Sequence, residues 1–190
     1  MLYLICGLLL WAGAHLMPSV ASGLRSRIIG AVGLQPYKGL FSLALLSALV
    51  LIVYGWQQTP PSALWNPPTG LRHLTILLMW PALVMFVAAR VPGNPIKAKL
   101  GHPQLMGVGT WALAHLLANG EWRSLVLFGG LLVWSFVNIK TLNARDGRDK
   151  PAVGAHPGRA LIITLVIGSL LWALLLWAHP HFTGRAVIAL

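Results

Sequence analysis

The sequence predicts an all-α protein, a polytopic membrane bundle of about six transmembrane helices that forms a single domain over residues 1–190. Two observations support this fold class. Hydrophobic residues make up 57% of the 190 residues and charged residues only 9%, whereas a soluble domain carries about 25% charged residues. The apolar residues are also gathered into long runs, and a spanning helix needs about 20 mostly apolar residues.

The apolar runs predict six spanning helices in order along the chain. They cover residues 2–20, 39–56, 71–90, 104–119, 122–140 and 160–178. Pro81 lies inside the third helix and is expected to kink it. Pro103 suits the first turn of the fourth helix, where a missing N–H costs nothing. Residues 57–70 are rich in proline and tryptophan and predict a surface loop without regular structure.

The basic residues predict the orientation of the chain in the membrane. Of the 14 basic residues, 11 fall after the first, third or fifth helix, and only Arg72, Arg123 and Arg185 fall on the other side. Loops that are rich in Lys and Arg tend to stay cytoplasmic, so both termini are expected to be periplasmic. The same distribution explains the net charge of +11 without a nucleic-acid partner, and it makes the lipid bilayer the expected partner.

Scarce acidic and thiol groups exclude several classes of chemistry. The chain has three carboxylates, Glu121, Asp146 and Asp149, and all are expected outside the spans. This pattern argues against a carboxylate proton relay, a paired-carboxylate hydrolase and an oxygen-ligand metal cage. Cys6 is the single cysteine, which excludes an internal disulfide, a cysteine-rich metal site and covalent c-type haem attachment.

Histidine is the remaining candidate for chemistry. Of the seven histidines, His15 and His115 lie within apolar helices, and His102 lies at the start of the fourth helix. An ionisable group inside a membrane is costly, which makes it a candidate functional residue; the alternative is a histidine bonded to the carbonyl of a neighbouring helix. The other four are interpreted as interfacial or loop residues: His73, His156, His179 and His181.

A local sequence repeat links two of these histidines. "WAGAH" ends at His15 and "WALAH" ends at His115, so each histidine follows a tryptophan on the same helix face with small residues between. His102 and His115 are separated by about 20 Å of helix and roughly 220° of rotation, so they cannot ligate one metal. Two histidines on facing helices, without thiolate or carboxylate, favour a b-type haem over a hydrolytic zinc.

The sequence resembles the NnrU family of bacterial membrane proteins. The matching pieces are "GAHLMPS", "LRHL", "NPIKAKLGHPQLMG…W..AH..ANGEW" and "HPHFTGR", in this order along the chain. The resemblance implies a multi-pass protein of the bacterial inner membrane, linked to denitrification and nitrogen-oxide metabolism. The family is distantly similar to 15-cis-ζ-carotene isomerases, which hold a b-type haem; this similarity implies His15 and His115 as haem ligands. Ala112 stands where those isomerases have a cysteine.

Three alternatives remain open at this stage. Helix direction places His15 closer in depth to His102 than to His115, so a site formed by His15 and His102 is the alternative pair. "GHPQLMG" resembles a segment of membrane methyltransferases of the isoprenylcysteine carboxyl type, which bind S-adenosylmethionine, although Leu105 replaces their tyrosine. A non-enzymatic accessory protein is the third alternative.

Under the haem hypothesis, the protein would have a redox or isomerase-like role and would act on a small apolar or gaseous substrate.

Overall fold

The computed structural model describes residues 1–147 and 150–184, and the regular elements in these ranges are all helices. This confirms the all-α membrane bundle. Contacts divide the chain into two compact units. Unit 1 combines Met1–Trp65 with Glu121–Gly147, and unit 2 combines Asn66–Gly120 with Arg148–Leu190. The prediction of a single domain stays a prediction.

Two long helices of unit 1, α1 (Leu2–Val20) and α3 (Leu34–Gln58), form a closely packed pair. Glycines set their separation. A Cβ added to Gly55 would lie 2.2 Å from the backbone nitrogen of Leu4, and one added to Gly7 would lie 2.8 Å from the α3 backbone. Neither position has room for a methyl group, so the two backbones are in direct contact, as is common where small residues join membrane helices.

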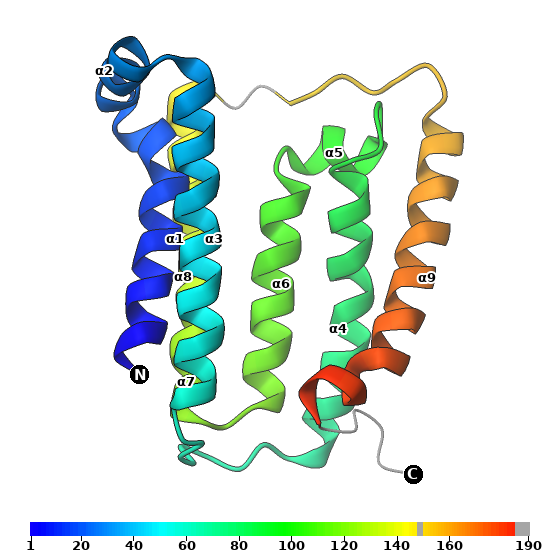
Figure 1. Ribbon diagram of the computed structural model, residues 1–190. Helices are drawn as coiled ribbons and strands as arrows, with labels where there is room; N and C mark the ends of the chain where they lie inside the picture. The colour runs from blue at the N-terminus through cyan, green and yellow to red at the C-terminus, as the bar shows by residue number, and fades with distance from the viewer. Residues whose placement is uncertain (148–149, 185–190) are drawn as a thin grey trace. The chain divides into compact units, whose positions relative to one another are not determined.

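A third long helical segment completes unit 1. It runs continuously as α7 (Trp122–Ser124), the π-helical turn η1 (Leu125–Gly129) and α8 (Gly130–Asp146), and it packs along α1 (Figure 1). The sequence predicts this helix over residues 122–140. Its start is confirmed, and its end lies further along the chain.

The short helix α2 (Ser22–Val32) occupies a segment that the sequence predicts as a loop, so this part of the prediction is wrong. Ala21 separates α2 from α1, and Gly33, with a φ of 87°, separates it from α3. This left-handed conformation favours glycine. In Figure 1, α2 folds over the shared end of α1 and α3. The start of α3 is also earlier than expected, because Pro36 fits its first turn, where backbone N–H groups have no intrahelical partner.

Unit 2 is built around α4 (Thr69–Ala88), which contacts both α6 (Pro103–Ala118) and α9 (Pro157–Thr183). These helices correspond to the third, fourth and sixth predicted spans. Figure 1 shows them side by side within the unit. A Cβ added to Gly107 of α6 would lie 2.9 Å from the carbonyl oxygen of Ala82, so a glycine again lets two helix backbones meet.

At one end of unit 2, hydrogen bonds of a single buried side chain connect two segments of the chain. Asn94 is 1% exposed and caps the short helix α5 (Pro95–Leu100), because its side-chain oxygen accepts a hydrogen bond from the Ile96 N–H at 2.8 Å. Its amide also donates to the Ala160 carbonyl at 3.2 Å and to the Thr164 hydroxyl, both on α9. One side chain therefore connects the segment before α6 to the start of α9.

Five helical segments of the described chain are long and apolar enough to cross a membrane. They are Leu2–Val20, Leu34–Gln58, Thr69–Ala88, Trp122–Asp146 and Pro157–His181. The remaining predicted span, the fourth in chain order at residues 104–119, is the helix α6, which has 16 residues. Its length of about 24 Å is less than the roughly 30 Å of hydrocarbon that a spanning helix crosses. The protein is therefore a multi-pass membrane protein whose α6 is shorter than the bilayer core.

The predicted surface loop between α3 and α4 is confirmed, since residues 59–68 form no helix. It is nevertheless tied to the start of α7. Ala63 and Glu121 form an isolated antiparallel bridge, and the Trp122 N–H donates to the Ser62 carbonyl at 3.1 Å. The loop thus joins the two sequence-distant parts of unit 1.

Candidate functional site

His15 lies on α1 inside unit 1, and its ring is fixed by the tryptophan one turn earlier. Its Nδ1 is 2.9 Å from the carbonyl oxygen of Trp11. The Trp11 and His15 ring centroids are 4.3 Å apart, with 41° between their planes. The sequence repeat therefore corresponds to a physical pairing, in which the tryptophan contributes its backbone oxygen and its ring.

Aromatic side chains from the other long helices of unit 1 surround the same ring. Trp134 of α8 meets His15 edge-on at 5.2 Å between centroids, and Phe41 of α3 does so at 6.0 Å. The indole nitrogens of Trp11 and Trp134 are buried and have no hydrogen-bond partner in the described part of the chain. His15 thus lies in an aromatic environment formed by α1, α3 and α8, beside two buried donors.

His115 lies on α6 inside unit 2 and repeats the arrangement. Its Nδ1 is 2.8 Å from the carbonyl oxygen of Trp111, and the two ring centroids are 4.9 Å apart, with 47° between planes. The last turn of α6 is held on both sides. The Thr75 hydroxyl of α4 donates to the Ala114 carbonyl at 2.8 Å, and the Asn119 amide donates to the His115 carbonyl at 2.9 Å.

These contacts determine which nitrogen of each imidazole can bind a metal. A carbonyl oxygen can only accept a hydrogen bond, so the Nδ1 of His15 and of His115 must carry the proton. In the neutral ring the lone pair then lies on Nε2. An Nδ1–H to backbone carbonyl bond is the usual way in which proteins orient a metal-ligating histidine.

His102 takes the position that the sequence predicts. It is the N-cap of α6, and Pro103 follows at the first helical position. His115 is in the last turn of the same helix. The two histidines therefore lie at opposite ends of α6, as the sequence predicts.

The structure assigns the glycines near these histidines mainly to packing. Gly7 of α1 and Gly107 of α6 lie against neighbouring helices and let the helix backbones approach closely. Gly13 differs from both, because a Cβ there would meet nothing within 4 Å. Gly13 is two residues before His15, about 200° away around the helix, so this open space is on the other side of α1 from the histidine.

Sequence reasoning missed three residues near the histidines. Trp134 and Phe41 have no sequence relation to His15 and come together with it only through packing in unit 1. His179 of α9 lies within range of a charge–charge interaction with His115 in unit 2.

A third copy of the Trp–His spacing lies at the end of α9 and was detectable in the sequence. "WAHPH" ends at His181, four residues after Trp177, and the two ring centroids are 5.3 Å apart.

Other metal-binding arrangements are not formed by the described residues. No group of three or more His, Cys, Asp or Glu side chains there could hold a metal ion. Two of the carboxylates are paired with arginines: Glu121 with Arg123 at 2.8 Å, and Asp146 with Arg145. Apart from the single thiol of Cys6 on α1, the groups suited to a transition metal within the described apolar helices are therefore imidazoles.

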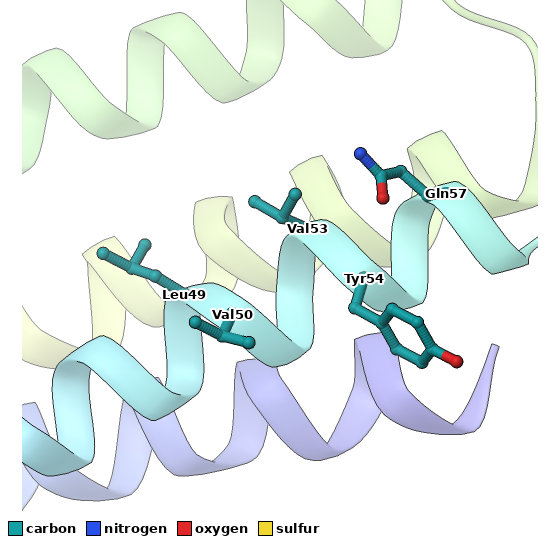
Figure 2. Close-up of a pocket in the computed structure, with 5 residues that line it drawn as sticks. All are labelled: Leu49, Val50, Val53, Tyr54 and Gln57. Atoms are coloured by element: carbon teal, nitrogen blue, oxygen red, sulfur yellow. The ribbon is translucent and has the colours of Figure 1, made fainter.

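A shallow hollow of about 320 Å³ lies on the surface of α3. Figure 2 shows that its labelled residues all come from that helix. They are Leu49, Val50, Val53, Tyr54 and Gln57. All five side chains are exposed and, except for Gln57, mainly apolar, which fits a surface that faces lipid. The hollow includes no histidine and is separate from the candidate site.

The comparisons with known proteins place the chain in a family. A family model described as "NnrU protein" matches residues 3–187. No curated protein and no solved structure matches the chain.

Proposed function

Because the chain belongs to the NnrU family, we propose that it binds b-type haem, which His15 and His115 would hold. Its role is a redox or isomerase-like reaction linked to nitrogen-oxide metabolism. The substrate is a small apolar or gaseous molecule that enters through the bilayer. His15 belongs to unit 1 and His115 to unit 2, so their binding to one iron stays a prediction.

One observation carries the proposal: both histidines have the same oriented tautomer. In each, Nδ1 donates to the carbonyl of the tryptophan four residues earlier, and the indole ring packs against the imidazole. Neutral imidazole is a suitable ligand for iron. The environment adds a second reason, because an unpaired buried donor costs about 1–3 kcal/mol, and the indole N–H groups beside His15 would recover this from a bound acceptor.

The side chains of this protein have defined parts in such a site. If haem is bound, His15 and His115 would hold it, and its iron would supply redox chemistry there. The Trp11 and Trp111 carbonyls hold the two rings in position, and Trp134 and Phe41 shield His15 on the side of α3 and α8. Thr75 and Asn119 fix the turn that carries His115.

An optical spectrum of the purified protein tests the proposal. We expect a Soret band for the natural sequence, and we expect His15→Ala and His115→Ala to abolish or shift it. His156→Ala is the matched control, because His156 is exposed at the start of α9, and it should leave the band unchanged.

Other results would redirect or end the proposal. Loss of the band in His102→Ala but not in His115→Ala would favour the pair His15 and His102. A protein that shows no Soret band after reconstitution with haem does not bind it as proposed. Binding of S-adenosylmethionine by that protein would point to the methyltransferase class.

A further inference from the structure

The helix α2 lies where the membrane surface must be. The helix before it, α1, has 19 residues and is about 28 Å long, which matches the hydrocarbon thickness of roughly 30 Å. Its last residue therefore lies near the end of the hydrocarbon. Because α2 begins two residues later and folds over the end of α1 and α3 (Figure 1), it lies at the interface.

The sequence of α2 is amphipathic. Leu24, Ile28 and Val32 follow one another at intervals of four residues and share one side of the helix. Leu24 and Val32 are 52% and 44% exposed, and α2 has no buried residue. Ser26 is also exposed and lies on the other side, whereas the exposed Arg27 lies at the edge of the apolar side, three residues after Leu24. A short helix of this kind can lie in the plane of the interface with its apolar side in lipid.

Cations gather at the same end of unit 1. Arg25 of α2 lies over the ring of Tyr37, with 5.5 Å from its guanidinium carbon to the ring centroid, and this contact holds α2 against α3. The end of α8 belongs to the same region, because Ser19 donates to the Thr141 hydroxyl at 3.0 Å. The basic residues of this end are Arg25, Arg27, Lys38, Lys140 and Arg145.

Among the residues that the structure describes, this end has more basic than acidic groups. The segment from α1 to α3 contains no Asp or Glu. Asp146, at the end of α8, is paired with Arg145. Within the described residues, the surface therefore combines an exposed apolar side with basic residues other than Arg145 that form no ion pair, and phosphate groups at a lipid surface complement both features.

We propose that α2 and the basic residues around it bind the headgroups of anionic phospholipids. Leu24, Ile28 and Val32 insert at the boundary between headgroups and acyl chains, and Arg27 contacts lipid phosphate. Arg25 stays against Tyr37 and holds the helix in place. The proposal is independent of haem binding, since it uses none of the histidines.

Native mass spectrometry of the full chain in detergent tests the lipid preference, with phosphatidylglycerol and phosphatidylcholine added in parallel. We expect the natural sequence to bind phosphatidylglycerol more tightly. Arg27→Gln should weaken this binding about fivefold, because each cation near an anionic surface contributes about 1 kcal/mol. The control Arg72→Gln removes an exposed cation at the start of α4 and should bind phosphatidylglycerol like the natural sequence.

Several results would overturn the proposal. One is equal binding of phosphatidylglycerol and phosphatidylcholine. Another is an equal loss of phosphatidylglycerol binding in Arg27→Gln and Arg72→Gln. A third is displacement of the bound lipid by inorganic phosphate. Spin labels at Leu24→Cys and Ser26→Cys, in a Cys6→Ala background, test the helix independently in vesicles that contain phosphatidylglycerol. We expect the label at position 24 to be more accessible to oxygen and the label at position 26 to a water-soluble relaxation agent; equal aqueous access at both would contradict an interfacial α2.

Discussion

The side chain of Arg123 connects the end of α3 to the start of α7 through several contacts. Its Nε donates to Glu121 at 2.8 Å, and its guanidinium also donates to the Thr59 carbonyl at 3.1 Å. The same group lies 4.4 Å from the centroid of the Trp56 ring. Carbonyls at the end of a helix lack intrahelical donors and carry partial negative charge. Arg123 therefore caps α3 from the start of α7.

We expect Arg123→Ala to lower the thermal stability of the protein in detergent, at a cost of about 1–3 kcal/mol for the lost partners of the Thr59 carbonyl and Glu121. The unfolding temperature of Arg123→Lys should lie between those of Arg123→Ala and the natural sequence, because lysine keeps the charge but lacks the planar fork of donors. Arg72→Ala is the control, since Arg72 is exposed. Unfolding temperatures for both Arg123 variants that equal the natural one would contradict this assignment.

The sequence locates the candidate histidines better than their surroundings. His15 and His115 stand out because they are polar residues in apolar helices, and the paired tryptophans are four residues away on the same helix. Trp134 could not be linked to His15 in advance. The two residues are 119 positions apart in the sequence, and only packing of α1 against α8 brings their rings to 5.2 Å.

The accuracy of the helix predictions follows the strength of the apolar signal. The first predicted helix, 2–20, coincides with α1, and α6 begins one residue before the predicted 104. Periodic apolar runs and a proline at the first turn explain this agreement. The helix α2 was missed because its Ser, Gly and Arg residues are typical of a loop, and only its position at the end of α1 and α3 stabilises it.

Glycine substitutions separate helix packing from helix propensity in α3. Gly55→Ala should destabilise the protein by about 1–3 kcal/mol, because its Cβ would lie 2.2 Å from the Leu4 backbone and would push α1 away from α3. Gly39→Ala is the matched control in the same helix, with nothing within 4 Å of its Cβ; it should stabilise the protein by about 0.5–1 kcal/mol. Thermal unfolding in detergent measures both. A Gly55→Ala variant as stable as Gly39→Ala would show that α1 and α3 do not depend on this contact.

At the scale of the whole molecule, the positions of the basic residues predict an orientation that a labelling experiment can test. Eleven of the 14 basic residues lie in or beside the connections expected to be cytoplasmic. In a Cys6→Ala background, a membrane-impermeant maleimide should label Ser62→Cys in intact spheroplasts. It should label Ser26→Cys only after the membrane has been opened. The reverse pattern would place the termini in the cytoplasm.

The interleaving of the two units has a consequence for biosynthesis. Unit 1 takes its first helices from residues before 66 and its last from residues after 120, and the two helices that open unit 2 lie between them in the sequence. A ribosome therefore delivers α1 and α3, then α4 and α6, before α8 exists. The helices α1 and α3 are therefore in the membrane before α8, and the side of α1 that packs against α8 is still uncovered. On that side Trp11 and His15 would be exposed to lipid until Trp134 has been synthesised and α8 has packed against α1.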